Sequence, residues 1–382
     1  MIYMDDLNRE ILAYALQNAL EFGEADVGRV LPKLFQHGLD KKDISKIMPS
    51  IREIVKKVNS ISNDERMKLF SEVEDAVKKH ERKNEHELPE LPSSEIGKKV
   101  VLRMAPFPSG ALHIGNAKTY LLNALYAEKY KGDLLLVMDD TIGSAEKPAM
   151  KESYKLIIDA WKLLDVKYKK IYYKSDRLDI YYDYAKKLID MNKAYVCYCK
   201  AEELRQNRAD GKECSCRQFP IGIQKARWKE LFKPEVHEGE AVLRIKTDME
   251  HPNPAFRDRV LFRIADRPHP RVGTKYRVWP TLEMTWAVDD HLLGITHVIR
   301  GNDLVIESDM EKYIWDIFRW KHPVLIHTGL INIEGVGAKL SKSKAQKEVL
   351  SGQFSGWDDP RTWSVQSLIR RGITKEAIRE FI

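Results

Sequence analysis

The strongest constraint on the fold is an alternation of apolar strand patterns with amphipathic helix patterns, which stops and later resumes. KVVLRM predicts a buried strand, and residues 113–131 predict a helix that Gly132 ends. DLLLVM predicts a second strand, a helix with Tyr154 and Trp161 on one face follows, and KIYY predicts a third strand. This alternation is typical of a parallel sheet that binds ligands at the carboxyl ends of its strands.

The alternation lapses between residues 178 and 279 and resumes with ITHVIRG, a helix and PVLIHTG. The interval contains every cysteine, basic helical segments and the strand patterns EAVLRIKTD and RDRVLFRIAD. The helix after the lapse is expected to begin with a capping box formed by Ser308 and Glu311. A parallel-sheet domain interrupted by an inserted α+β domain explains both the lapse and the resumption.

The N-terminal region, residues 5–83, contains helical patterns and no convincing strand. The clearest is SNDERMKLFSEVEDAVKK, with Asn63 as the expected N-cap and Phe70 and Val73 on one face. A charged segment broken by two prolines follows and is typical of a linker. We therefore predict a small all-helical domain that ends near residue 95.

Composition excludes some classes of protein. The chain has 64 basic and 57 acidic residues, and the net charge of +7 favours a polyanionic partner only weakly. No run of 18 apolar residues occurs, and the start, MIYMDDLNRE, is acidic where a signal peptide would be basic and then apolar. We expect a cytoplasmic protein that does not contact a membrane.

The turn SGALHIGN leads from the first strand to a helix N-terminus, where backbone N–H groups and the helix dipole favour a phosphate. Gly115 would let the backbone approach a nucleotide, and His113 and Asn116 could donate hydrogen bonds to phosphate oxygens. The alternative is an ordinary turn whose histidine only caps or packs. A second segment, GAKLSKSKAQK, contains Lys339 and Lys342; it could close over a triphosphate, although most lysine runs are solvated loops.

The four cysteines form the pattern C-x-C-x14-C-x-C. Cys197, Cys199, Cys214 and Cys216 could supply the four thiolates of a closed, tetrahedral, structural Zn²⁺ site. The alternative is a group of free cytosolic thiols that lie close together by chance. Two short-spaced pairs separated by one loop favour zinc.

HIGN at 113–116 and KLSKS at 339–343 resemble the HIGH and KMSKS signatures of class I aminoacyl-tRNA synthetases, in that order around the insertion. Longer strings, including VLRIKTDMEHPNPAFRDRVLFRI, AVDDHLLGITHVIRGND and WDDPRTWSVQSLIRRG, are similar to archaeal and eukaryotic glutamyl-tRNA synthetases. The resemblance covers residues 96–382 strongly and the helical leader more loosely.

The resemblance implies a Rossmann-like parallel-sheet catalytic domain with an inserted tRNA-acceptor-binding domain, preceded by an all-helical domain. The expected parts are the helical domain and linker (1–95), the first catalytic half (96–178), the insertion with the cysteines (179–279), the second catalytic half (280–335), and the KMSKS loop with the start of the stem-contact region (336–382).

The function implied by the resemblance is ATP-dependent activation of L-glutamate to glutamyl-adenylate and transfer to the 3′ end of tRNA. The residues expected to act in catalysis are His113, Asn116, Lys339 and Lys342, and those expected to bind ATP are His113, Gly115, Asn116 and Lys342. The residues expected to bind the amino acid are Arg103, Asp139, Arg300 and Leu282. Mg²⁺ is expected to accompany ATP. The residues expected to hold the acceptor end of tRNA are Lys200, Arg205, Arg208, Lys212, Arg217, Arg257 and Arg259.

Three positions depart from the family pattern. Asn116 replaces the second histidine of HIGH, Leu282 replaces the tyrosine of PTYDFA, and Val137 replaces an arginine. These changes leave the choice between glutamate and glutamine open, and also the choice between their tRNAs. The alternatives are a glutaminyl-tRNA synthetase, a non-catalytic tRNA-binding relative and a small-molecule nucleotidylyltransferase.

The sequence ends in the helix pattern TKEAIREFI, and nothing in it resembles the β-barrel domains that bind the anticodon in this family. We expect either that the protein continues past residue 382 or that a separate C-terminal polypeptide supplies these domains. This chain alone is expected to activate glutamate poorly, because such enzymes need bound tRNA for that step, and not to read the anticodon.

Overall fold

A computed structural model describes residues 2–37, 39–40, 43–77, 88–92, 99–144, 147–329, 331 and 342–382. The chain divides into two compact units, Met1–Leu88 and Pro89–Ile382. The boundary expected near residue 95 falls in the stretch 93–98, which lies outside the described residues. No described helix combines the length and the apolar character that crossing a membrane requires.

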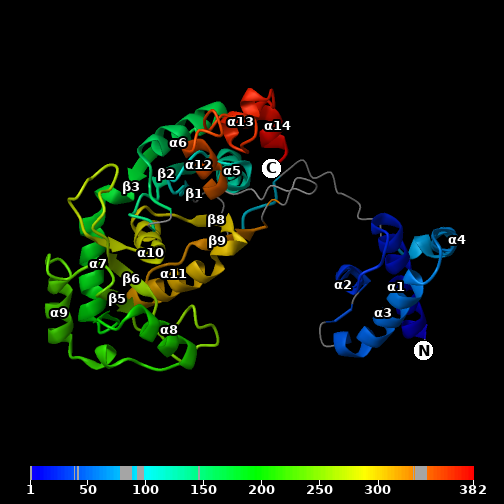
Figure 1. Ribbon diagram of the computed structural model, residues 1–382, viewed down its shortest axis with the longest axis horizontal. Helices are drawn as coiled ribbons and strands as arrows, with labels where there is room; N and C mark the ends of the chain where they lie inside the picture. The colour runs from blue at the N-terminus through cyan, green and yellow to red at the C-terminus, as the bar shows by residue number, and fades with distance from the viewer. Residues whose placement is uncertain are drawn as a thin grey trace. The chain divides into compact units, whose positions relative to one another are not determined.

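The first unit is helical, as predicted (Figure 1). Its helices are α1 (Ile2–Phe22), α2 (Val27–Leu34), α3 (Ile44–Asn59) and α4 (Asn63–Val73). Their apolar faces meet in one core that includes Ile11, Leu16, Leu34 and Ile51. The predicted N-cap of α4 is wrong by one residue: the cap is Ser62, because its hydroxyl and the Glu65 carboxylate form a reciprocal capping box.

The second unit contains the predicted parallel sheet. Its first strands are β1 (Val101–Met104), β2 (Asp133–Met138) and β3 (Lys170–Tyr173), and the helices between them are α5 (Ile114–Lys129) and α6 (Lys151–Leu163). The later strands β8 (His297–Gly301) and β9 (Val324–Thr328) also pair in parallel. The Thr296 N–H donates to the Val101 carbonyl (2.9 Å), so β8 begins beside β1. The two halves that the insertion separates in sequence are therefore joined.

The insertion forms an antiparallel sheet, in the lower part of this unit in Figure 1. The strands, in spatial order, are β4 (Ala194–Cys197), β5 (Val242–Ile245), β6 (Val260–Ile264) and β7 (Val278–Pro280). The accompanying helices are α7 (Leu178–Asp190), α8 (Ala201–Asp210) and α9 (Ile221–Glu230). One apolar cluster joins this sheet to α10 (Leu282–Leu292) and α11 (Val305–Phe318), so the insertion shares its core with the helices that follow it.

The predicted capping box of α11 is wrong. The helix begins at Val305, after a turn at Asn302–Leu304, so Ser308 lies inside the first turn and donates to the Leu304 carbonyl (3.0 Å). The Glu311 carboxylate accepts hydrogen bonds from the buried Arg300 guanidinium instead. A charged donor holds the carboxylate more strongly than a backbone N–H would.

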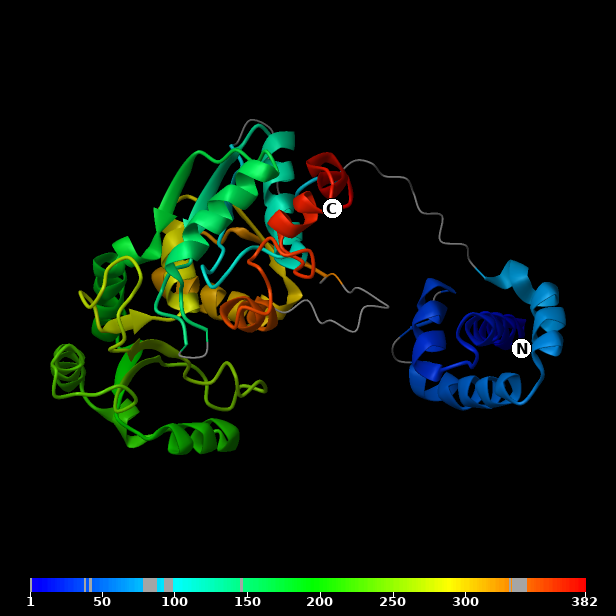
Figure 2. The ribbon, with the colours of Figure 1, turned by 45° about the horizontal axis from the view of Figure 1, so that its top comes forward.

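The C-terminal helices are α12 (Lys342–Leu350), α13 (Val365–Arg370) and α14 (Lys375–Glu380), coloured orange to red in Figure 2. The chain before α13 pairs with the turn that precedes α5. The Ile114 N–H donates to the Trp363 carbonyl (2.9 Å), and the Val365 N–H donates to the Leu112 carbonyl (2.8 Å). This pairing fixes the HIGN turn against a segment about 250 residues later in the chain.

Candidate functional site

A cavity of about 600 Å³ opens where β1, β2 and β8 end and α10 begins. Six of the residues singled out in the sequence line it: Arg103, Asn116, Asp139, Arg259, Leu282 and Arg300. His113 and Gly115 lie at the start of α5 but are not among the lining residues. Lys339 lies outside the described residues, as does the side chain of Lys342, so the lysine loop has no described geometry.

Both arginines of the cavity are paired with buried acids. Arg103 on β1 contacts Asp290 of α10 through two nitrogens, with 2.8 Å between Nη2 and Oδ2. Arg300 on β8 donates to both oxygens of Glu311, at 2.7 Å each. All four side chains are at most 5% exposed. The partners hold each guanidinium in one orientation and cancel its charge.

Asp139 lies directly after β2 and forms an ion pair with Lys174 (2.8 Å). Lys174 is fully buried and also donates to the Thr285 hydroxyl (2.7 Å). Burial raises the pKa of Asp139, and the nearby Lys174 and Arg103 oppose that effect. Asp139 therefore places a carboxylate at the end of β2, and Lys174 balances its negative charge.

Trp286 of α10 is the common neighbour of the three cations. The centroid of its ring lies 5.3 Å from the Arg103 guanidinium carbon, 5.0 Å from Lys174 Nζ and 5.2 Å from the Arg300 guanidinium carbon. The side chain is 5% exposed and lines the cavity. Among the described residues, neither its Nε1–H nor the Nε–H of Arg300 has an acceptor.

Glu311 is the most strongly perturbed acid of this group. Burial raises the pKa of Glu311 to about 7, although Arg300 acts in the opposite direction. The charge of Arg300 is therefore compensated fully above this pH and less below it.

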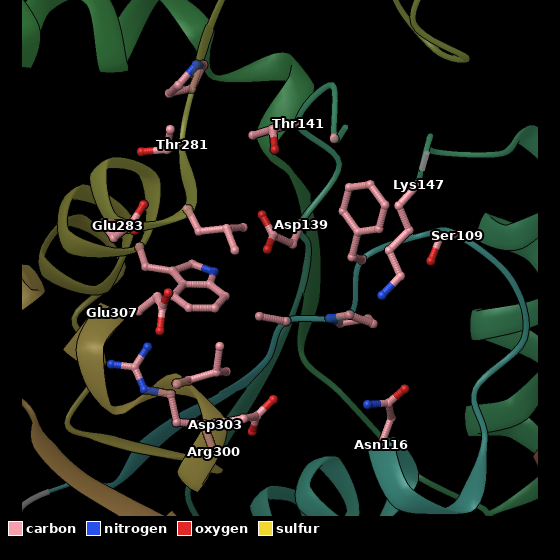
Figure 3. A pocket seen from close by; sticks show the side chains of 18 of the residues that line it. Ser109, Asn116, Asp139, Thr141, Lys147, Thr281, Glu283, Arg300, Asp303 and Glu307 are labelled. Carbon is pink, nitrogen blue, oxygen red and sulfur yellow. The ribbon is translucent and has the colours of Figure 1, made fainter. Parts of the chain in front are cut away.

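At the start of α5, His113 caps the helix and Asn116 lines the cavity. The Asn116 backbone N–H donates to His113 Nδ1 (3.4 Å), so the histidine is the N-cap of this helix. In Figure 3 the side chains of Asn116 and Lys147 point toward the same part of the cavity. Asp139 and Arg300 lie in other parts of the cavity wall.

Sequence patterns alone do not single out several residues of this site. Lys147, Lys174, Trp286, Asp290 and Glu311 belong to no spacing pattern that marks a function. Asp290 and Glu311 lie on different helices and meet their arginines only through the tertiary fold. α5 and β2 separate Lys147 from the HIGN turn in the chain, so no local pattern marks this lysine.

The four cysteines form one cluster at the end of β4. Their sulfur atoms all lie within 4.8 Å of one another, and the Sγ atoms of Cys197 and Cys214 are 3.7 Å apart. Four sulfurs at about 2.3 Å from a tetrahedral Zn²⁺ would be about 3.8 Å apart, so the cluster fits this ion. A hydrogen bond from Cys197 lowers the pKa of the Cys214 thiol to about 5, against the effect of burial. The chemistry and spacing of these donors suit a closed site.

Several basic residues of the insertion bind internal acceptors. Arg208 donates to the carbonyls of Pro254 and Ala255, and Arg257 donates to carbonyls that include that of His251. Arg217 forms ion pairs with Asp258 and Glu213. Arg259 forms ion pairs with Glu283 and Glu307. Lys200 and Arg205 are exposed on or beside α8. Lys212 also pairs with Asp210 (3.3 Å), so five of the seven residues expected at a tRNA surface have internal contacts.

The chain matches one family model and several curated relatives. The family model described as tRNA synthetases class I (E and Q), catalytic domain, matches residues 99–382. The glutamate–tRNA ligases of Pyrococcus furiosus and Thermococcus kodakarensis are 44% and 43% identical, over 99% of this chain and 66% of each relative. The crystal structure of glutamate-tRNA synthetase from Elizabethkingia anophelis has a TM-score of 0.49 and 23% identity, over 65% of this chain and 54% of that one.

The chain spans 66% of the length of the archaeal relatives that it resembles. The matched residues include the parallel strands β1, β2, β3, β8 and β9, the antiparallel insertion and the C-terminal helices. By this match, the chain belongs to the class I tRNA synthetases for glutamate and glutamine.

Proposed function

We propose that the chain is the catalytic part of a glutamate–tRNA ligase, which activates L-glutamate with ATP and transfers it to the 3′ end of tRNA. The archaeal relatives named above carry this activity in their names. The observation that carries the proposal is the cavity, where Arg103, Asp139 and Arg300 meet at the ends of three strands beside the start of α5.

In this proposal, the amino acid lies against the side chains of Arg103, Asp139 and Arg300. The Asp139 carboxylate accepts hydrogen bonds from the α-amino group, and the two guanidinium groups donate hydrogen bonds to the carboxylates of the substrate. Because Asp290 and Glu311 hold the guanidinium groups in place, binding costs little side-chain entropy. The Nε–H of Arg300 and the Nε1–H of Trp286 are donors without acceptors among the described residues, and they suit the oxygens of a substrate side chain.

The triphosphate lies at the start of α5. The α-carboxylate of glutamate attacks the α-phosphorus of ATP, a new C–O–P bond forms, and the bond to the β-phosphate breaks to release pyrophosphate. The nucleophile is already ionised, so the chain needs to supply alignment and positive charge rather than a base. The hydrogen bond to His113 Nδ1 places its ring proton on Nε2, where it can serve as a donor to phosphate.

Positive charge at the phosphates is assigned to Lys339 and Lys342 by the KMSKS resemblance. We add Lys147, which points toward the same part of the cavity as Asn116 (Figure 3). Asn116 can donate a hydrogen bond but carries no charge, and a lysine nearby compensates for that deficit. Mg²⁺ would neutralise the triphosphate while bound to its oxygens.

The cysteine cluster is proposed to hold a structural Zn²⁺. Cys197, Cys199, Cys214 and Cys216 would occupy all four positions of a tetrahedral ion, which would tie the end of β4 to the turn after α8. The insertion is proposed to contact the acceptor end of tRNA through exposed residues such as Lys200 and Arg205. Such contacts weaken with salt.

Glutamine is the second candidate substrate. The family model covers both amino acids, and Asp290 and Glu311 already cancel the charges of the two arginines. A neutral amide therefore meets less electrostatic penalty here than beside unpaired arginines. Leu282 also provides no hydroxyl to select one side chain over the other.

One experiment separates the two candidates. The 382-residue chain is incubated with ATP, total archaeal tRNA and labelled glutamate or glutamine, and acid-precipitable label is measured. We expect glutamate to be attached, and purified tRNAs for the two amino acids then show whether the enzyme discriminates between them. Charging with glutamine alone would overturn the choice of substrate. No tRNA-dependent charging or pyrophosphate exchange with either amino acid, even with any missing C-terminal part supplied, would favour a tRNA-binding relative without activity.

A further inference from the structure

Arg244 of β5 is a buried cation beside the cysteine cluster. It is 1% exposed and lies opposite Tyr195 in the pairing of β4 with β5. Its Nη1 lies 3.9 Å from Cys197 Sγ and 3.8 Å from Cys214 Sγ. Among the described residues, no carboxylate lies within 4.0 Å of its guanidinium, and its Nη2 has no hydrogen-bond partner. Tyr195 and the Asp258 carboxylate act on this guanidinium through space, and the groups able to carry negative charge that Nη1 contacts are the two sulfur atoms.

A buried guanidinium without a carboxylate in direct contact is costly. Removing an ion from water costs several kcal/mol unless an opposite charge and hydrogen bonds replace the solvent. Four thiolates around one Zn²⁺ carry a net charge of −2, which is equally costly to bury alone. Arg244 and such a site would therefore each reduce the desolvation cost of the other.

The guanidinium is held in the orientation that this role requires. Its Nε donates to the Asp258 carbonyl (2.8 Å), and its carbon lies 5.5 Å from the centroid of the Tyr195 ring. The Asp258 carboxylate accepts from the Tyr195 hydroxyl (2.8 Å) and the Thr247 N–H (2.7 Å). Asp258 has a φ of +38°, a left-handed conformation that these contacts stabilise.

We propose that Arg244 is a positioning residue for zinc: it compensates the charge of the four thiolates and directs N–H groups at two of them. The proposal rests on the zinc site put forward under the proposed function. It does not depend on amino acid or tRNA binding. A direct contact with tRNA phosphate is excluded by the 1% exposure of Arg244.

The test measures metal affinity rather than charging. Metal-free protein is prepared under reducing conditions, and Zn²⁺ and Co²⁺ affinities are measured at one pH and salt concentration by competition with a chromophoric chelator. The variants are R244Q, R244M and R244K. The matched control is K246Q, which removes a cation two residues away whose Nζ donates to Asn192 (2.8 Å).

We expect R244Q and R244M to weaken Zn²⁺ binding by about 10- to 100-fold, the usual effect of losing an outer contact to a metal ligand. R244K should recover part of the loss because it restores the charge, and K246Q should bind as the natural chain does. The Co²⁺ absorption bands of a tetrahedral four-thiolate site should persist in every variant. R244M covers the case in which R244Q does not fold, because it fills a similar volume without a polar atom.

Natural affinity in R244Q or R244M would overturn the role of Arg244 while leaving the zinc site in place. Failure of the natural chain to bind Zn²⁺ or Co²⁺ would overturn the zinc site and this inference together. Neither result bears on the proposed ligase activity, which is measured separately through charged tRNA.

Discussion

The Ile114 N–H donates a 2.9 Å hydrogen bond to the carbonyl of Trp363. This bond joins the first residue of α5, within the HIGN turn, to the WDDPRTW segment that follows α12. The same segment places Trp357 over Gly110, three residues before His113. The turn proposed to hold ATP is thus positioned in part by the chain that follows the lysine loop.

Gly110→Ala should disrupt this arrangement. A Cβ at Gly110 would lie 2.3 Å from Cη2 of Trp357, and the φ of +147° is one that other residues rarely adopt. We expect a loss of about 1–3 kcal/mol in the free energy of unfolding, as for overpacking elsewhere, and at least about tenfold slower pyrophosphate exchange. Urea unfolding and the exchange assay measure these two effects.

Two further variants show whether backbone strain or the clash with Trp357 causes the loss. Gly294 has a positive φ of +66° and no atom within 4 Å of an added Cβ, so Gly294→Ala reports backbone strain alone. The double variant Gly110→Ala, Trp357→Phe should recover part of the lost activity because the smaller ring leaves room. If it recovers none, Trp357 is not the obstacle.

Lys147 should contribute charge at the triphosphate. Because it points toward the same part of the cavity as Asn116, Lys147→Met should raise the KM for ATP in pyrophosphate exchange by about tenfold, the loss of one charged contact. Asn116→His alone should raise activity modestly. The control is Lys155→Met, an exposed lysine of α6 that pairs with Asp159.

The double variant Asn116→His, Lys147→Met provides the sharper measurement. If both positions serve the same phosphate, the added histidine should restore part of what the lysine removed. Effects that simply add would show that the two side chains act independently. A rise from no activity to full activity in Asn116→His would mean that the natural chain is not a working enzyme.

Trp286→Phe should affect the amino acid rather than the nucleotide. The variant keeps an aromatic ring beside the three cations but removes the Nε1–H, which has no acceptor among the described residues. We expect the KM for glutamate to rise by about tenfold with kcat changed by less than about threefold. Trp161→Phe removes a similarly buried, unsatisfied N–H from α6, away from the cavity lining. Equal effects of both variants would indicate lost packing instead.

The order of strands and helices could be predicted from the sequence because hydrophobic periodicity and glycine stops are local signals. The cysteine cluster was predictable for the same reason, since its spacing is short. The predicted cap at Ser308 failed because Glu311 contacts Arg300, a partner set by how β8 packs against α11. The meeting of Arg103, Lys174 and Arg300 around Trp286 brings together segments that lie far apart between residues 103 and 300, and no local pattern encodes it.

The pairing of Arg300 with Glu311 predicts a specific dependence of stability on pH. In the unfolded chain the Glu311 carboxyl has a pKa near 4.5, whereas in the fold burial raises it to about 7. Between these values the folded state retains a proton that the unfolded state has lost, so the contribution to stability is complete below pH 4.5 and is lost as the pH rises through 7. The loss is on the order of 3 kcal/mol.

Glu311→Gln cannot titrate at this position, and urea unfolding of both proteins between pH 5 and 8 measures the difference in the free energy of unfolding. The free energy of unfolding of the natural chain should fall relative to the variant as the pH rises. Parallel profiles would show that Glu311 stays ionised beside Arg300 throughout this range.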